Sequence, residues 1–301
     1  MLEARAFEPD FLHKLDRLVL GIRRARTVRS GQRTLGRIQG LGLEVENFKE
    51  YSPGDDLRFL DWNAMARLDD LLIRTYRAER QVEITAVVDA SASMAFPERD
   101  DKLGFALALG ASLAYIGMGD NDAARIAAFS APRGRMKLES TSFRRRRESY
   151  LDFKPFVMRV KAGGETRLGA AVDELLRERR PAGIVIVISD FLVSQTDYED
   201  ALSRLVAARH EVKVIHVMGE QESTGSYPPG FYFVRDAETG ETRETVFGLE
   251  LASACRRKVE DLSARLREFC RTYNIVYVEA FGARNLESVL SRELPRLGVI
   301  R

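Results

Sequence analysis

The sequence predicts an α/β fold in which a mainly parallel sheet carries helices on both of its faces. From residue 83 onward, apolar strands alternate with helices along the chain. The stretch 183–190 (GIVIVISD) is apolar almost throughout, as is typical of a strand that is covered on both faces. The helix expected at 102–116 (KLGFALALGASLAYI) is apolar nearly all round, so it should pack directly on the sheet.

The first part of the chain, residues 1–82, is expected to be a mixed N-terminal segment. Apolar residues at helical spacing predict an amphipathic helix over 7–24. The basic, glycine-punctuated stretch 23–37 predicts a loop or arm, which either contacts an anionic partner or is solvated and neutralised by acidic groups elsewhere. Two short apolar stretches, 43–48 and 71–75, are expected to form strands.

The second part, residues 83–301, is expected to hold the sheet. A hairpin near 227–247 interrupts the alternation, with strands FYFVRD and TRETVF joined by AETGE. The basic run Arg144–Arg147 is interpreted as an exposed loop or the start of a helix. The remaining elements follow from their apolar patterns: strands at 82–89, 122–130, 183–190, 212–218 and 274–280, and helices at 102–116, 166–180, 198–209, 249–272 and 286–297.

The composition limits the classes of protein to which this chain can belong. Its 301 residues are 45% hydrophobic and 31% charged, which is ordinary for a globular protein and argues against disorder. The net charge of +2 indicates no polyanionic partner. No run of about 18 apolar residues predicts a transmembrane helix, and the acidic start MLEARAFEPD does not resemble a signal peptide. We therefore expect a cytoplasmic location.

The two cysteines are not expected to form a disulfide. Cys255 and Cys270 fall within one predicted helix, where 15 residues correspond to about 22 Å. This distance is too long for a bridge, and free thiols suit a reducing compartment.

Oxygen-bearing side chains gather where the expected strands end. Asp89, Ser91 and Ser93 follow the first strand of the sheet, Thr166 belongs to a Gly-Gly-Glu-Thr loop, and Asp190 ends a later strand. Ligand sites in open α/β sheets lie at the carboxyl ends of strands. Two carboxylates and three hydroxyls, with no soft ligand, favour Mg²⁺ or Mn²⁺ over zinc or copper.

The order of these motifs resembles the metal-ion-dependent adhesion site of von Willebrand factor A domains, which have a Rossmann-like fold. The resemblance covers residues 83–301 and implies that Ser91, Ser93 and Thr166 bind the ion directly. Asp89 and Asp190 would act directly or through water. It also implies Mg²⁺, with Mn²⁺ or Ca²⁺ as alternatives, and an open position that a partner protein fills with a carboxylate.

Local capping is the alternative interpretation of the same residues. Asp89 and Thr166 could cap the helices that follow them, and Asp190 could begin a turn. Capping explains each residue separately, but it does not explain why Ser91 and Ser93 accompany them.

A second motif precedes the sheet. The block 51–67 (YSPGDDLRFLDWNAMAR) is similar to the signature of the bacterial family called domain of unknown function 58, or DUF58. Lys49 stands where that family usually has Arg, and Asn63 where it often has Lys. Family members carry the block just before a domain that resembles a von Willebrand factor A domain, and this chain resembles their branch without membrane helices.

The block has two physical interpretations, a structural lock and a binding surface. Pro53-Gly54 predicts a tight turn. The acidic loop that follows is expected to face Arg58 and Arg67, within reach for ion pairs. Trp62 is the only tryptophan and is expected to anchor the block against the sheet.

The resemblance implies a non-enzymatic protein-binding module. Such proteins are associated with AAA+ ATPases of the MoxR type, in assemblies thought to remodel client proteins or insert metal into them. A metal-dependent phosphatase is an alternative, but it needs a second carboxylate two residues after Asp89, where this chain has Ser91. Nucleic-acid binding through the basic stretches is another, although they lack interleaved aromatic residues.

Overall fold

The chain forms two units, each of which is described by itself. The computed structural model describes residues 2–21, 27–29, 44–53, 57, 60–68, 70–79, 82–118, 122–224, 228, 230–236, 241–282 and 286–300. The sheet unit combines Met1–Gly21 with Val82–Arg301, and the smaller unit is Ile22–Gln81. The N-terminal stretch that the sequence presents as one segment is therefore divided, with its first residues packed in the sheet unit.

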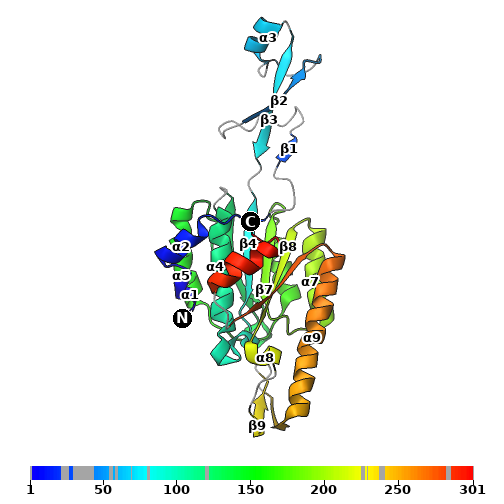
Figure 1. Ribbon diagram of the computed structural model, residues 1–301. Helices are drawn as coiled ribbons and strands as arrows, with labels where there is room; N and C mark the ends of the chain where they lie inside the picture. Colours follow the sequence, from blue (N-terminus) through cyan, green and yellow to red (C-terminus); the bar gives the residue numbers. More distant parts are fainter. Residues whose placement is uncertain are drawn as a thin grey trace. The chain divides into compact units, whose positions relative to one another are not determined.

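A six-stranded sheet forms the centre of the sheet unit, as predicted (Figure 1). Its strand order is β11-β8-β7-β4-β5-β6, and every pair is parallel except β5 with β6. The antiparallel edge strand β6 was not predicted, because its four residues are half exposed and lack an apolar run. The strands are β4 (Glu83–Asp89), β5 (Ala123–Ser130), β6 (Lys137–Ser140), β7 (Ile184–Ser189), β8 (Glu211–Met218) and β11 (Val276–Phe281).

Helices cover both faces of this sheet, which confirms the α/β prediction. One face packs against α6 (Leu168–Arg177), α7 (Gln195–Ala207) and α9 (Leu249–Thr272), through a cluster that includes Leu175, Leu202 and Leu266. The other face packs against α4 (Lys102–Met118), which is buried over nearly its whole length. Shorter helices surround α4: α1 (Leu2–Arg5), α2 (Pro9–Leu15), α5 (Lys154–Arg159) and α10 (Leu286–Ser288).

The direction in which successive strands are added to the sheet changes at β4. From β4 the chain crosses to β5 on one side, and after β6 and α6 it returns to β7 on the other side of β4. In doubly wound sheets, a crevice opens at such a switch point, outside the carboxyl ends of the two strands. Four of the predicted site residues lie here: Asp89 ends β4, Ser91 and Ser93 follow it, and Asp190 follows β7.

The prediction of a single helix over 7–24 is wrong. The helix α2 ends at Leu15, and the chain then pairs with the C-terminal segment: Leu20 forms an antiparallel bridge with Ile300. Gly21 donates a 2.8 Å backbone hydrogen bond to Val299. A Cβ on Gly21 would lie 2.4 Å from the carbonyl oxygen of Gly298, so this close approach needs glycine.

The C-terminal part of the sheet unit follows the sequence prediction in outline. The hairpin consists of β9 (Gly230–Arg235) and β10 (Thr242–Phe247), and α9 begins and ends where expected. A short helix, α8 (Glu220–Thr224), precedes the hairpin and was not predicted. The expected helix 286–297 is divided into α10, a π-helical turn (Val289–Glu293) and α11 (Leu294–Arg296).

Two other predictions concern basic or thiol side chains. Arg147 begins a 3₁₀ helix (Arg147–Phe153) and pairs with Asp16 at 2.9 Å, so the run 144–147 does include a helix start. Cys255 and Cys270 are both free and both lie in α9, as expected.

The smaller unit contains a three-stranded antiparallel sheet and one helix. Its strand order is β1-β3-β2, with β1 (Thr27–Arg29), β2 (Glu44–Glu50) and β3 (Leu72–Glu79). The loop predicted over 23–37 is therefore wrong at 27–29, and the rest of that basic stretch lies outside the described residues.

Part of the block 51–67 is visible in this smaller unit. Asp61 caps α3 (Trp62–Leu68), because its Oδ1 accepts hydrogen bonds from the backbone of Asn63 at 3.0 Å and Ala64 at 3.2 Å. Trp62 is 64% exposed, so it is not a core residue of its unit, and its contact with the sheet unit stays a prediction. Residues 54–56, 58 and 59, including the acidic pair and Arg58, lie outside the described residues.

Candidate functional site

The residues predicted from the first strand meet at the carboxyl end of β4. Asp89 is fully buried, and its Oδ1 accepts a 2.8 Å hydrogen bond from the backbone N–H of Ser91. The Ser91 and Ser93 hydroxyl oxygens lie 2.9 Å apart, and both side chains are buried. The short 3₁₀ helix Ala92–Ala95 turns the chain so that both hydroxyls stay on one side of the loop.

Thr166 reaches the same place through a backbone ladder between two loops. Ala92 donates a 2.9 Å hydrogen bond to the carbonyl of Gly164, and Gly163 donates one of 2.9 Å to Ala90. Gly164 has φ +80°, and a Cβ there would lie 2.5 Å from the backbone of Ala131, so only glycine fits without strain. Thr166 itself is 7% exposed.

Asp190 is joined to this group through the end of β7. The hydroxyl of Ser189 donates a 2.6 Å hydrogen bond to Oδ2 of Asp89, and Asp190 is 2% exposed. Phe191 follows with φ +53°, a conformation that non-glycine residues rarely adopt, and its N–H donates to the Ser189 hydroxyl at 2.9 Å. All five predicted site residues therefore come from adjoining loops at the switch point of the sheet.

Helix capping does not account for these residues. The first turn of α4 is capped by Asp101, whose Oδ1 accepts from Gly104 at 3.1 Å. The first turn of α6 is capped by Asp197 from the neighbouring helix, which accepts from Leu168 at 3.1 Å and Gly169 at 3.2 Å. Asp89 and Asp190 each accept a hydrogen bond from a backbone N–H two residues later. For Asp190 this is the turn role that the alternative allowed, whereas for Asp89 the alternative expected a helix cap.

The electrostatics of the site favour a cation. Burial, together with the nearby charge of Asp190, raises the pKa of Asp89 from 3.8 to about 7. The three hydroxyls of Ser91, Ser93 and Thr166 are neutral oxygen donors and add no opposing charge. A buried carboxylate beside hydroxyl oxygens is a donor set that suits a hard divalent cation, so the residues present fit Mg²⁺.

Lys102 was not predicted and supplies the positive charge at this site. Its Nζ is fully buried and donates to Oδ2 of Asp190 at 2.9 Å and to Oε1 of Glu222 in α8 at 2.9 Å. Burial opposes the charge on Lys102, but the two carboxylates outweigh it, so its pKa is raised. A lysine at the start of an apolar helix gives no sequence signal, because its partners lie 88 and 120 residues away.

Two open hollows border the candidate site. One, of about 540 Å³, is lined by Thr166, Leu192 and Asp197 among others. The second, of about 410 Å³, is lined by Ala90, the residue after Asp89, and by three basic side chains and one acidic one: Lys137, Arg159, Lys161 and Glu139. The excess of positive charge in the second hollow favours the approach of an acidic group.

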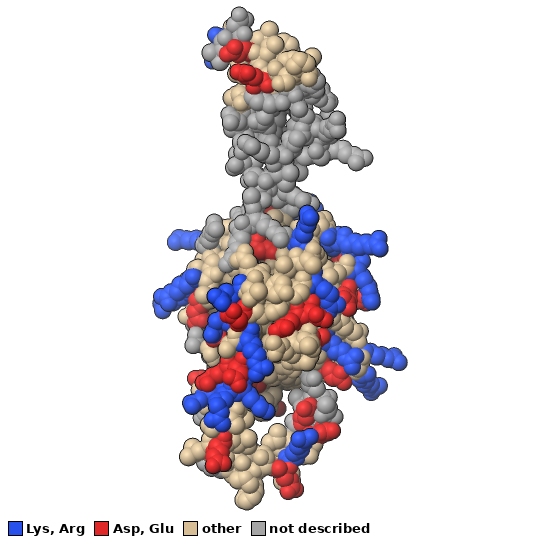
Figure 2. Space-filling model, turned by 90° about the vertical axis from the view of Figure 1, so that its right-hand side faces the viewer, with Lys and Arg blue, Asp and Glu red and all other residues tan. Residues whose placement is uncertain are grey.

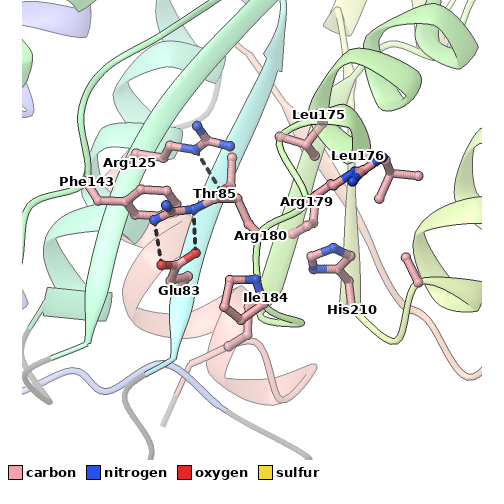
Figure 3. Close-up of a pocket in the computed structure, with 13 residues that line it drawn as sticks. Glu83, Thr85, Arg125, Phe143, Leu175, Leu176, Arg179, Arg180, Ile184 and His210 are labelled. Atoms are coloured by element: carbon pink, nitrogen blue, oxygen red, sulfur yellow. Dashed lines mark hydrogen bonds and ion pairs between the residues drawn. The ribbon is translucent and has the colours of Figure 1, made fainter.

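A further pocket lies at the opposite, amino end of the parallel strands (Figure 3). Its volume is about 300 Å³, and the guanidinium groups of Arg125 and Arg180 both stack on the Phe143 ring. Arg180 forms two hydrogen bonds with Glu83, of 3.0 and 2.6 Å, while Arg125 pairs with Glu178 at 2.8 Å. Because these arginines are already neutralised, we interpret the pocket as a structural clamp between strands and helix.

Two structural features are absent from the described part of the chain. No group of three or more His, Cys, Asp or Glu side chains is arranged to hold a metal, so the predicted site depends on its hydroxyl oxygens. Within the same residues, no helix has the length and apolar character that crossing a membrane requires.

Comparisons with known proteins connect the chain to a family without an assigned activity. The family described as "Protein of unknown function DUF58" matches residues 47–268. Uncharacterized proteins of Mycobacterium tuberculosis and Mycobacterium bovis are 33% identical over 213 residues, which are 70% of this chain. The match spans 65% of the length of each relative.

Solved structures give only weak likenesses. The conserved hypothetical protein BatB from Bacteroides thetaiotaomicron is 18% identical, with a TM-score of 0.44, and the match covers 72% of this chain and 98% of that protein. The pilus adhesin SpaC from Lactobacillus rhamnosus is 12% identical, with a TM-score of 0.45 over 73% of this chain and 30% of the adhesin. At these TM-scores, neither likeness carries weight for the function.

Proposed function

The chain belongs to the DUF58 family, and we propose that it is a non-enzymatic module that binds a partner protein through a divalent cation. In this proposal the sheet unit is a von Willebrand factor A-like domain and the cation is Mg²⁺, with Mn²⁺ or Ca²⁺ as alternatives. One observation carries the proposal: the buried Asp89 carboxylate, with its raised pKa, lies beside the paired hydroxyls of Ser91 and Ser93.

Each of the five site residues has a role in this proposal. Ser91, Ser93 and Thr166 supply neutral hydroxyl oxygens, while Asp89 and Asp190 supply negative charge directly or through water. Lys102 neutralises part of the charge on Asp190, because its ammonium group lies 2.9 Å from Oδ2. Because few carboxylates of this protein would bind the cation, the cation could accept one more carboxylate ligand. The partner's side chain would provide that ligand.

The surroundings favour an acidic side chain on the partner. Arg159 and Lys161 line the hollow that begins at Ala90, directly after the Asp89 strand end. A carboxylate that approaches the cation would therefore also meet positive charge from the protein. On the resemblance to DUF58 proteins, we propose an AAA+ ATPase of the MoxR type and a client protein as partners that are coupled through the cation, which binds a carboxylate of the partner.

The first experiment measures cation binding. We expect Mg²⁺ to raise the melting temperature of the wild-type protein, and Ser91→Ala/Ser93→Ala to lose this response while keeping its fold. The control variant Ser253→Ala/Ser291→Ala also removes two hydroxyls, but these bond only to their own helices and Arg257. It should respond to Mg²⁺ like the wild type. An equal response in all three proteins would contradict the proposed site.

The second experiment measures partner binding with the same three proteins. A co-expressed MoxR-type ATPase should be retained by the wild type and the control variant in Mg²⁺, and by neither in EDTA. Retention that is insensitive to EDTA and to Ser91→Ala/Ser93→Ala would place the contact away from the cation. Phosphatase turnover that requires Asp89 would overturn the non-enzymatic proposal.

A further inference from the structure

The hairpin β9–β10 exposes an aromatic face that its own chain does not cover. Its strands pair only with each other among the described residues, and Phe231 lies opposite Val246 in the register. Phe231, Phe233 and Val246, which we call the aromatic face, are 88%, 74% and 60% exposed. They share one side of the hairpin because side chains alternate along a strand.

The opposite side of the hairpin is packed in part, although Val234 on that side is 50% exposed. The Tyr232 ring lies against Phe247 with their centroids 6.0 Å apart, and Phe247 is 9% exposed. This ring contact lies within the hairpin and on the side opposite to the aromatic face, so it leaves Phe231 and Phe233 exposed. Leu249, at the start of α9, adds another apolar side chain that is 88% exposed. Clustered exposed apolar groups of this kind mark interaction surfaces.

The hairpin and the start of α9 are acidic in sequence. Residues 230–250 contain five acidic and two basic side chains, a net charge of −3 in a chain whose total is +2. One of the two basic residues, Arg243, pairs with Glu241 at 3.5 Å. Figure 2 shows acidic side chains, with some basic ones among them, beside uncharged residues at the lower end of the view, where Figure 1 places β9.

We propose that the aromatic face binds a basic amphipathic segment of a partner protein. The segment places apolar side chains on Phe231 and Phe233, and its Lys or Arg side chains lie beside Glu241 and Glu244. The charge of the hairpin argues against the other occupants. An anionic membrane surface and a second copy of the same hairpin both carry negative charge and would be repelled.

The hairpin is close in the chain to the candidate cation site but does not depend on it. It follows α8, and Glu222 of α8 pairs with Lys102, which also binds Asp190. The aromatic face and the candidate cation site therefore lie at the same end of the sheet unit, where one partner can contact both. The contact itself uses apolar and acidic groups of the hairpin, so it should persist in EDTA.

The test uses synthetic peptides as probes of the proposed chemistry. A Leu–Lys peptide of about 18 residues, long enough to form an amphipathic helix, is compared with a Leu–Glu peptide of the same pattern, all in EDTA. We expect the Leu–Lys peptide to bind the wild type at least about tenfold more tightly than Phe231→Ser/Phe233→Ser. The control Leu151→Ser/Leu297→Ser changes apolar residues that are 57% and 46% exposed elsewhere, and it should bind like the wild type.

A charge variant completes the test. Glu241→Lys/Glu244→Lys should lose the Leu–Lys peptide and gain affinity for the Leu–Glu peptide. Equal binding of the Leu–Lys peptide to the wild type and to Phe231→Ser/Phe233→Ser would overturn the proposal. So would binding to phosphatidylglycerol vesicles, or self-association of the wild type, that requires the two phenylalanines. Since Ser91→Ala/Ser93→Ala should keep peptide binding, failure of the cation proposal is distinguishable from failure of this one.

Discussion

The substitution Asp89→Asn should have opposite effects on the metal-free protein and on the response to Mg²⁺. In the folded protein the pKa of Asp89 is raised from 3.8 to about 7, chiefly by burial and also by Asp190. At about 1.4 kcal/mol for each pKa unit, the buried negative charge destabilises the folded state by about 4 kcal/mol above pH 7. Asn has the same shape without the charge, and its Oδ1 can still accept from the backbone of Ser91.

The sign of the pH dependence follows from this raised pKa. A carboxyl that holds its proton more tightly when folded favours the folded state most below pH 4, and this contribution is lost as the pH rises to about 7. In EDTA, the stability advantage of Asp89→Asn over the wild type should therefore be close to zero at pH 4 and approach about 4 kcal/mol at pH 8.

Urea unfolding at a series of pH values, in EDTA and again with Mg²⁺, measures both effects. At 100 times its dissociation constant, Mg²⁺ should stabilise the wild type by about 2.7 kcal/mol and should not stabilise Asp89→Asn. If Asp89→Asn is less stable than the wild type at pH 8 in EDTA, Asp89 is not a destabilised buried carboxylate. If Mg²⁺ stabilises both proteins equally, Asp89 is not part of a cation site.

Three further predictions test the packing of the same region. Gly164→Ala should destabilise the protein by roughly 1–3 kcal/mol in urea unfolding because Gly164 has a φ of +80° and its backbone surroundings are crowded. Gly163→Ala is the control: a Cβ there would have nothing within 4 Å, so it should cost less than about 1 kcal/mol. Equal losses of stability in the two variants would contradict the close approach at Gly164. Burial lowers the pKa of His216 to about 4, so its NMR signals should show a neutral ring at pH 5.5. The contribution of His216 alone, measured as the difference in stability between the wild type and His216→Gln, should fall by roughly 3 kcal/mol as the pH drops from 6.5 to 4. A midpoint near 6.5 would show an accessible ring. Lys102→Met leaves the buried carboxylate of Asp190 and the partly buried one of Glu222 without their cation, and it should destabilise the metal-free protein by about 3–5 kcal/mol. Mg²⁺ should recover part of that loss in a thermal melt, and an undiminished stability in EDTA would show that the ion pairs are unimportant.

The strands and the long helices could be predicted from local pattern alone. The parallel strands are continuous apolar runs because both of their faces are covered, and α9 keeps one apolar stripe over 24 residues. The motifs after β4 and β7, and the loop that carries Thr166, were predicted to converge because carboxyl ends of parallel strands meet at one edge. Their oxygen chemistry was readable from residue type, and binding of a cation by them stays a prediction.

Interactions between distant parts of the chain could not be predicted in this way. After α2 ends at Leu15, Leu20 pairs with Ile300 near the C-terminus, and the cap of α6 is Asp197 on another helix. The ion pairs of Lys102 join residues 88 and 120 positions away, and the exposure of Phe231 depends on which face of the hairpin packs. Periodicity describes neighbours along the chain, whereas burial, charge pairing and close approach depend on neighbours in space.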